Sequence, residues 1–313
     1  MRLALRRAVP RFVAAALAAL FLISGCAAPR LVQLDHPLAG RIWDVSQRRF
    51  LSPLEAEDRI AAADIALLGE THDNPAHHQI QTQLLQRLVA QGKRPAVAME
   101  QFDTDWQTAM DDARRAGGTS TAVAKAGNMS NGWEWPLYRP IVTVAMKEQL
   151  PIVAANLSRN RTRSIAGGGL AALGKGEPER LALNQPWNAD QNATLRGMLV
   201  DGHCGDDGPM IDKLIDVQRA KDAVMADRIL AGGPASVAII GRSHARQDIG
   251  VPLYLKARAP GKRVVSVGLV EVEAGRTRAE DYRDAVPGIH DILWFTPSSV
   301  RSDPCAGYKK FGR

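Results

Sequence analysis

Two stretches decide the fold: ADIALLGETH at residues 63–72 and VAIIGRSH at residues 237–244. Each is a short apolar run that ends in Gly-x-x-His, and short apolar runs bounded by turn residues predict buried strands. Ligands gather at the carboxyl ends of the strands in open parallel sheets. We therefore expect the two histidines, His72 and His244, to converge on one site.

Strands and helices alternate outward from these two segments. We expect strands at residues 63–69, 95–99, 151–154, 235–240, 263–269 and 291–295, the last of them at an edge of the sheet. We expect helices at residues 75–91, 103–115 and 137–148, and a helix or loop at 251–257. This alternation predicts an α/β fold, in which a mostly parallel β-sheet is flanked by helices.

The segment at residues 157–231 interrupts the alternation, because it contains no convincing strand. Its apolar spacing predicts helices near residues 163–172, 187–200 and 209–231. We interpret it as a helical insertion in a single domain at residues 40–300, followed by a C-terminal tail at residues 301–313.

Composition excludes several classes of protein. The chain has 313 residues, of which 45% are hydrophobic, and this is incompatible with a disordered protein or a small disulfide scaffold. The net charge of +7 includes four arginines within the first 11 residues. If that segment is removed, 7 − 4 leaves +3, which does not indicate a nucleic-acid partner.

The N-terminus has the pattern of a secretory signal peptide at residues 1–25, with a basic start and an apolar run. It ends in Ile23-Ser24-Gly25-Cys26, which resembles a bacterial lipobox. We expect lipidation at Cys26, a lipid-anchored tether at residues 26–39 and a location in the bacterial cell envelope. Ala27 follows the cysteine in place of Asp, and by resemblance to the sorting rule this favours the outer membrane.

Two further cysteines, Cys204 and Cys305, lie in loop-like sequence rich in Gly, Asp and Pro. In an oxidising compartment we expect them to form a disulfide that joins the C-terminal tail to a mid-chain loop. The alternatives are two metal ligands beside His203, or two free thiols.

Polar residues at three predicted strand ends are the candidates for chemistry: Glu70, His72, Glu100 and His244. The structural alternative makes the two glutamates helix-cap or salt-bridge residues and the two histidines hydrogen-bonded groups at the sheet edge. His77 and His78 lie in the first turn of the next helix and either face the same cleft or solvent. Arg159, Arg161 and Arg163 form either a solvated face or a carboxylate clamp. The aromatic segment Trp133–Pro140 forms either a packed cover or a platform for a flat ligand.

Five motifs together resemble the ChaN-type haem-binding lipoproteins: Gly69–Asn74, Ala98–Phe102, Trp135–Pro140, Asn156–Arg159 and Gly241–His244. The resemblance implies haem uptake at the envelope, with two stacked haems in a homodimer and a tyrosine on each iron. It makes Tyr138 the expected iron ligand, with Tyr254 in reserve. His72, His77, His78 and His244 are the expected cofactor-binding histidines, and an outer-membrane haem receptor is an expected partner. Because Cys-x-x-Cys-His is absent, haem would be bound without thioether links.

The same motifs also resemble the wider Tiki and erythromycin-esterase-like proteins. That resemblance implies a hydrolase, in which Glu70, His72, Glu100 and His244 activate water directly or through a divalent ion. A third interpretation is an envelope scaffold with an inert site.

Overall fold

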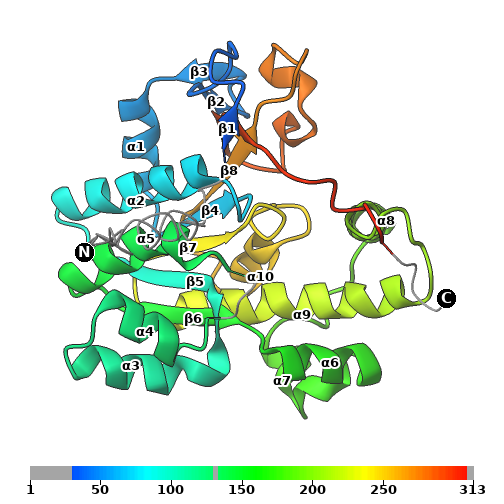
Figure 1. The fold of residues 1–313 in the computed structure, drawn as a ribbon. Helices are drawn as coiled ribbons and strands as arrows, with labels where there is room; N and C mark the ends of the chain where they lie inside the picture. Colours follow the sequence, from blue (N-terminus) through cyan, green and yellow to red (C-terminus); the bar gives the residue numbers. More distant parts are fainter. Residues whose placement is uncertain (1–29, 130–132, 309–313) are drawn as a thin grey trace, which may run out of the picture.

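The computed structural model describes residues 30–129 and 133–308. Its central sheet has eight strands in the order β3-β2-β9-β8-β4-β7-β5-β6 (Figure 1). The strands are β2 (Ile42–Asp44), β3 (Arg49–Leu51), β4 (Ile65–Glu70), β5 (Ala96–Asp103), β6 (Ile152–Asn156), β7 (Ser236–Gly241), β8 (Val264–Glu271) and β9 (Ile292–Thr296). All pairs from β9 to β6 are parallel, which confirms the predicted α/β fold with a mostly parallel sheet.

The prediction that residues 291–295 form an edge strand is wrong. β9 pairs in parallel with β8 and, on its other side, antiparallel with β2, where Ile42 lies opposite Trp294. β2 in turn pairs with β3, so a short hairpin covers the edge that was expected to be free.

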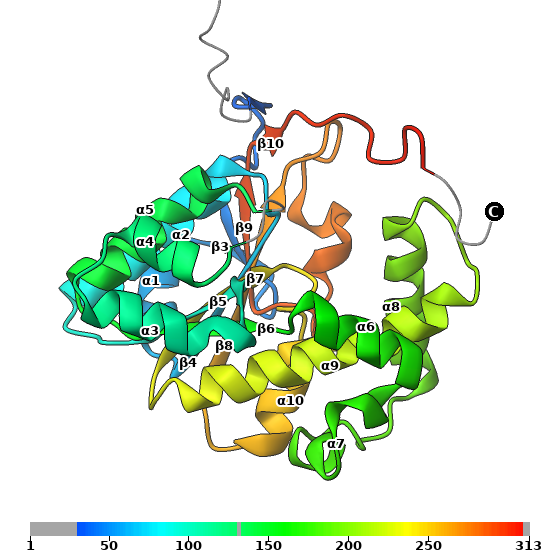
Figure 2. The ribbon, with the colours of Figure 1, turned by 60° about the horizontal axis from the view of Figure 1, so that its bottom comes forward.

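Helices cover both faces of the sheet (Figure 2). One face carries α1 (Pro53–Ala61), α2 (Pro75–Ala90), α3 (Gln107–Arg115), α4 (Ser120–Ala126) and α5 (Trp135–Lys147). The other carries α6 (Arg159–Gly168), α9 (Met210–Ala231) and α10 (Val251–Arg258). Strand β4 shows why two layers form: Leu68 packs toward the first group, and its neighbour Leu67 packs toward the second.

The predicted insertion consists of helices joined by turns and contains no strand. After α6 come the short α7 (Glu177–Arg180), α8 (Ala189–Gly202) and the long α9, which packs against β6. The first of these helices begins at Arg159, earlier than predicted, because the Ser158 side chain caps it.

The N-terminal segment departs from the predicted tether. Residues 31–32 form β1 (Leu31–Val32), which pairs with β10 (Ser298–Ser299), and Leu38 is buried beside Trp43. The segment therefore belongs to the folded body from residue 31 onward. The predicted signal peptide and Cys26 lie outside the described residues. Among the helices that the structure describes, none is long and apolar enough to cross a membrane.

Candidate functional site

The parallel register places the predicted strand-end residues together. β4 and β7 are neighbours, with Glu70 opposite Gly241, so His72 and His244 leave the sheet side by side. β5 lies next to β7 and supplies Glu100. This strand continues to Asp103, so the expectation that Glu100 ends it was wrong: the register between β5 and β6 shifts after Met99, and the strand runs on.

Glu70 is a buried carboxylate surrounded by donors. It accepts hydrogen bonds from Tyr138 Oη at 2.6 Å, Gln81 Nε2 at 2.7 Å and His72 Nδ1 at 2.9 Å. His78 Nδ1 lies 3.3 Å away. Burial by itself raises the pKa of Glu70, but His78, His72 and the Tyr138 hydroxyl outweigh it and hold the pKa below its ordinary value.

A second buried cluster surrounds His244. Its Nδ1 lies 2.5 Å from Asp222 Oδ1, and its Nε2 lies 3.3 Å from Glu100 Oε1. Burial opposes protonation of the ring, but the two carboxylates raise the pKa of His244 to about 10. Glu100 also accepts the backbone N–H of Gly241 at 2.7 Å, which ties β5 to the end of β7. The two carboxylates thus favour the protonated ring of His244, and a protonated imidazole is a poor general base.

Like His244, three further side chains expected at the haem surface are buried in the structure: Tyr138, His77 and His78. Tyr138 is fully buried, its hydroxyl donates to Glu70, and burial followed by the charge of Glu70 raises its pKa above the ordinary value. His77 accepts the Thr71 N–H and contacts Thr296, and burial lowers its pKa to about 3. His78 contacts the His72 carbonyl and is also buried.

Tyr254, the reserve ligand, is 3% exposed and packs on the opposite face of the sheet. The described arrangement therefore does not present Tyr138, Tyr254, His77, His78 or His244 to a surface ligand. Each would have to leave the core to contact haem, so their expected direct contact with haem stays a prediction.

His72 is the exposed member of the histidine set at this edge. Its side chain is 43% exposed, and Glu70 holds its Nδ1. Burial lowers the pKa of this ring, but Glu70 and Glu100 outweigh it and raise the pKa above 6.5. His72 contacts Trp133 edge-on, with ring centroids 4.7 Å apart, and Trp133 contacts Tyr138 in the same way at 5.9 Å. Trp133 thus both covers Tyr138 and offers a flat wall beside His72.

A pocket of about 680 Å³ opens beside His72. Side chains from the sheet edge, from the aromatic segment and from the insertion line it, among them His72, Gln101, Trp133, Asn156, Arg159 and Lys221. Neither Arg159 nor Lys221 forms an ion pair with another residue that the structure describes. Arg161 and Arg163 of the predicted basic cluster are exposed on α6 and do not line this pocket.

Sequence reasoning missed Gln81, Asp222 and Lys221. Gln81 lies on α2, and the other two lie next to each other on α9. For Gln81 and Asp222, the sequence offered one signal: a polar residue among the apolar positions of a helix face. For Lys221 it offered none, because a lysine on a helix ordinarily indicates a solvent-exposed position.

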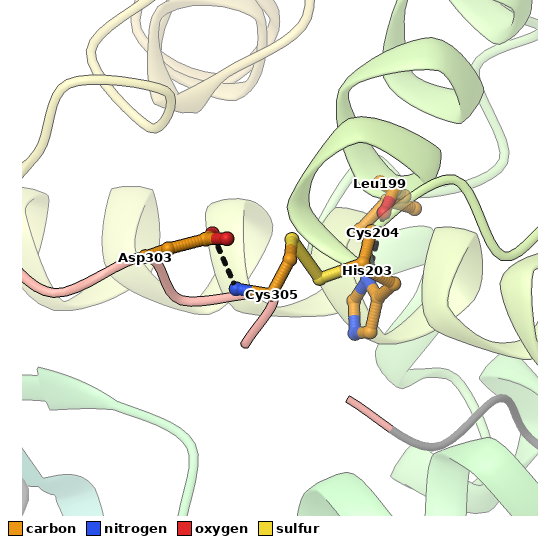
Figure 3. The surroundings of a disulfide bond; sticks show 5 residues. All are labelled: Leu199, His203, Cys204, Asp303 and Cys305. Carbon is orange, nitrogen blue, oxygen red and sulfur yellow. Dashed lines mark hydrogen bonds between the residues drawn. A yellow bond between two sulfur atoms is a disulfide. The ribbon is translucent and has the colours of Figure 1, made fainter. Parts of the chain in front are cut away.

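The predicted disulfide is confirmed, since Cys204 at the end of α8 is bonded to Cys305 in the tail (Figure 3). Bonded sulfurs do not ligate metal, so the alternative of a metal pair beside His203 is excluded. Within residues 30–129 and 133–308, no group of three or more His, Cys, Asp or Glu side chains is arranged to hold a metal ion.

A parallel sheet with polar side chains at its carboxyl edge and a pocket above them defines an α/β ligand-binding protein. More narrowly, the chain belongs to the haem-binding uptake family of the Tiki superfamily, ChaN, whose sequence model matches residues 56–255. The family gives the chain a haem-binding role. No curated protein matches the chain significantly in sequence.

Among solved structures, the chain is similar to ChaN of Campylobacter jejuni, described for cofacial haem binding. The two share 23% identity over 81% of this chain and 95% of that one, with a TM-score of 0.66. This confirms the fold. An erythromycin esterase, EreC, in its open conformation is 11% identical over 85% and 98% of the two chains, with a TM-score of 0.48. A Bacillus cereus protein is 12% identical over 88% and 97%, with a TM-score of 0.45.

Proposed function

We propose that the chain binds haem in the pocket beside His72 and that His72 Nε2 is the iron ligand, in place of the predicted Tyr138. The observation that carries this proposal is that His72 is half exposed while its Nδ1 is held by the buried Glu70. A carboxylate bound to one imidazole nitrogen orients the ring and makes the other nitrogen a better metal ligand. Imidazole is a common axial ligand of haem iron.

The rest of the pocket fits the remaining parts of haem. Trp133 offers a flat apolar wall for the macrocycle. Arg159 and Lys221, which form no close ion pair among the described residues, offer two cations for the propionates. These three contacts come from the loop before α5, from α6 and from α9, so haem would join the insertion to the sheet.

The test is a haemin titration of a soluble form that begins at Ala27, followed by absorption spectroscopy. We expect a saturable Soret band that is lost in His72→Ala and kept in Tyr138→Phe. Loss of the band in Tyr138→Phe alone would show that Tyr138 is the iron ligand and that its side chain leaves the core when haem binds.

Arg159 and Arg161 supply a matched pair for the propionate contact, because both lie on α6 and only Arg159 lines the pocket. Arg159→Ala should weaken haemin binding about tenfold, the value of a charge-assisted contact of about 1.4 kcal/mol, whereas Arg161→Ala should not. Equal effects of the two substitutions would contradict the proposed clamp.

We also propose that two chains bind haem cofacially and that Cys26 carries a lipid anchor in the outer membrane, with a haem receptor as partner. The Campylobacter ChaN likeness supports the first of these, and the lipobox supports the second. A shift from monomer to dimer on a sizing column after haemin addition tests the first. Mass spectrometry of the N-terminal peptide, which should carry acyl groups on Cys26, tests the second.

A further inference from the structure

A two-stranded ribbon formed by β1 and β10 joins the start of the folded body to the C-terminal tail. Leu31 lies opposite Ser299 and Val32 lies opposite Ser298. Two exposed apolar side chains flank the ribbon, Leu34 at 64% and Val300 at 55% exposure. In Figure 2 the ribbon lies at the end of the molecule remote from α7 and α10, and Figure 1 also places it far from α7.

The ribbon is held firmly to the sheet. The backbone N–H of Ser299 donates to Glu271 Oε1 at 3.1 Å, and the Ser298 hydroxyl donates to the Val272 carbonyl. Arg301 follows directly and forms ion pairs at 2.6 Å with both Asp73 and Glu271. An anchor attached to β1 would therefore fix the orientation of the whole body.

The ribbon adjoins a row of hollows that leads to His72. One hollow of about 750 Å³ is lined by Gln33 and Ser298 beside the ribbon, and by Thr71 and Arg242 farther in. A smaller hollow of about 270 Å³ shares Thr71 and Arg242 with it and extends to His72. The lining of these hollows shares only His72 with the pocket proposed for haem.

The chain between the ribbon and the proposed anchor is short. Only four residues separate Cys26 from Leu31. Because an extended chain advances at most about 3.6 Å per residue, the spacer spans about 18 Å at most. A lipid on Cys26 would thus hold β1 within about that distance of the bilayer surface, which is less than the width of a domain of this size.

We propose that the ribbon face, defined by β1, β10, Leu34 and Val300, rests on the lipid bilayer, so that the hollow beside it opens next to the headgroups and α7 points away. This inference rests on the lipid anchor proposed above and does not depend on haem binding. Leu34 and Val300 contribute apolar contact, and Arg30, which is exposed at the start of β1, contributes a cation for anionic headgroups.

The test uses the full lipidated protein in vesicles of phosphatidylethanolamine and phosphatidylglycerol doped with a nitroxide-headgroup lipid. A fluorophore is attached to Leu34→Cys, to Val300→Cys or to the control Glu179→Cys, which is exposed on α7. We expect several-fold stronger quenching at the two ribbon positions than at the control. A second form with about 20 Gly/Ser residues inserted before Arg30 should lose most of this difference, because such a linker spans about 25 Å on average.

The outcomes separate this inference from the proposal on which it rests. Equal quenching at all three positions in a protein whose Cys26 carries acyl groups overturns the orientation and leaves the anchor. Absence of acyl groups on Cys26 overturns the anchor and the orientation with it. Stronger ribbon quenching that survives the inserted linker supports the orientation and shows that Leu34, Val300 and Arg30 hold this face to the bilayer without the short spacer.

Discussion

At the scale of single residues, the centre of the molecule is one buried carboxylate and the donors that neutralise it. A buried ionised group is tolerated only when it is paired and hydrogen-bonded. Glu70 meets this requirement with contacts from three different segments, Tyr138, Gln81 and His72. The same contacts orient His72 and leave it exposed, whereas the Tyr138 hydroxyl is buried and already bonded to Glu70. One set of hydrogen bonds therefore decides which side chain is available to a ligand.

Tyr138→Phe should therefore be a stability variant. Removing a hydrogen bond to a buried carboxylate is expected to lower the free energy of unfolding by about 1.5–3 kcal/mol, with the haemin spectrum unchanged. Urea unfolding followed by circular dichroism measures this. Tyr282→Phe is the comparison, because the Tyr282 hydroxyl contacts only backbone groups of Glu273 and Arg276, and it should cost about 1 kcal/mol. A Tyr138 variant as stable as the parent would show that Glu70 does not depend on the phenol.

The pH dependence of haem binding follows from the raised pKa of His72. Below that pKa the ring is protonated at Nε2, and the proton competes with iron for the same nitrogen. Haemin affinity should therefore rise with pH, by up to about tenfold per pH unit, and level off above the pKa of His72. Spectroscopic titrations across this range measure it. If His72 instead bound a propionate as a cation, affinity would fall as pH rises, so the sign of the slope decides between the two roles.

At the scale of elements, the longer buried strands were predictable and the short ones were not. β4, β7 and β8 are apolar runs of six to eight residues, and their pattern is unambiguous. β2 and β3 have three residues each, too few to show a period of two, and missing them made β9 look like an edge. The convergence of Glu70, His72, Glu100 and His244 was also predictable, since it follows from parallel strand order alone.

The two glycines of the Gly-x-x-His segments, Gly69 and Gly241, make room for different neighbours. A methyl group on Gly69 would lie 2.8 Å from Ala245 Cβ and 2.9 Å from the Arg242 backbone, so Gly69→Ala should force β4 away from the β7 turn. We expect a loss of about 1–3 kcal/mol in unfolding free energy. On Gly241 the nearest atom would be His72 Cε1 at 3.1 Å, so Gly241→Ala should displace the His72 ring, weakening haemin binding more than stability. The reverse ranking of the two variants in paired unfolding and haemin titrations would contradict this division.

At the scale of the whole molecule, the pocket is assembled from parts far apart in sequence. His72 comes from the sheet, Trp133 from the segment before α5, and Lys221 from the insertion. Sequence patterns located the sheet edge but not the burial of Tyr138, because its orientation depends on how α5 packs against α2 and α4. Aromatic composition alone did not distinguish a side chain that covers the core from one that faces a ligand.

The disulfide closes this assembly by joining the insertion to the tail. Cys204 and Cys305 are separated by 101 residues, and cross-linking a loop of about that length is expected to stabilise the fold by up to about 4.7 kcal/mol through the entropy of the unfolded chain. The double variant Cys204→Ser/Cys305→Ser should lose most of that free energy in urea unfolding, and reductant should lower the parent to the level of the variant. The unreduced parent should resist thiol labelling when unfolded. Because this bond is the covalent link between α8 and the tail beyond Arg301, amide exchange should rise first in residues 302–308 of the variant, while Arg301 keeps the ribbon in place. A variant of unchanged stability would contradict the stabilising role of the disulfide. Exchange that rises first at β1 and β10 would show that the disulfide, and not Arg301, holds the ribbon.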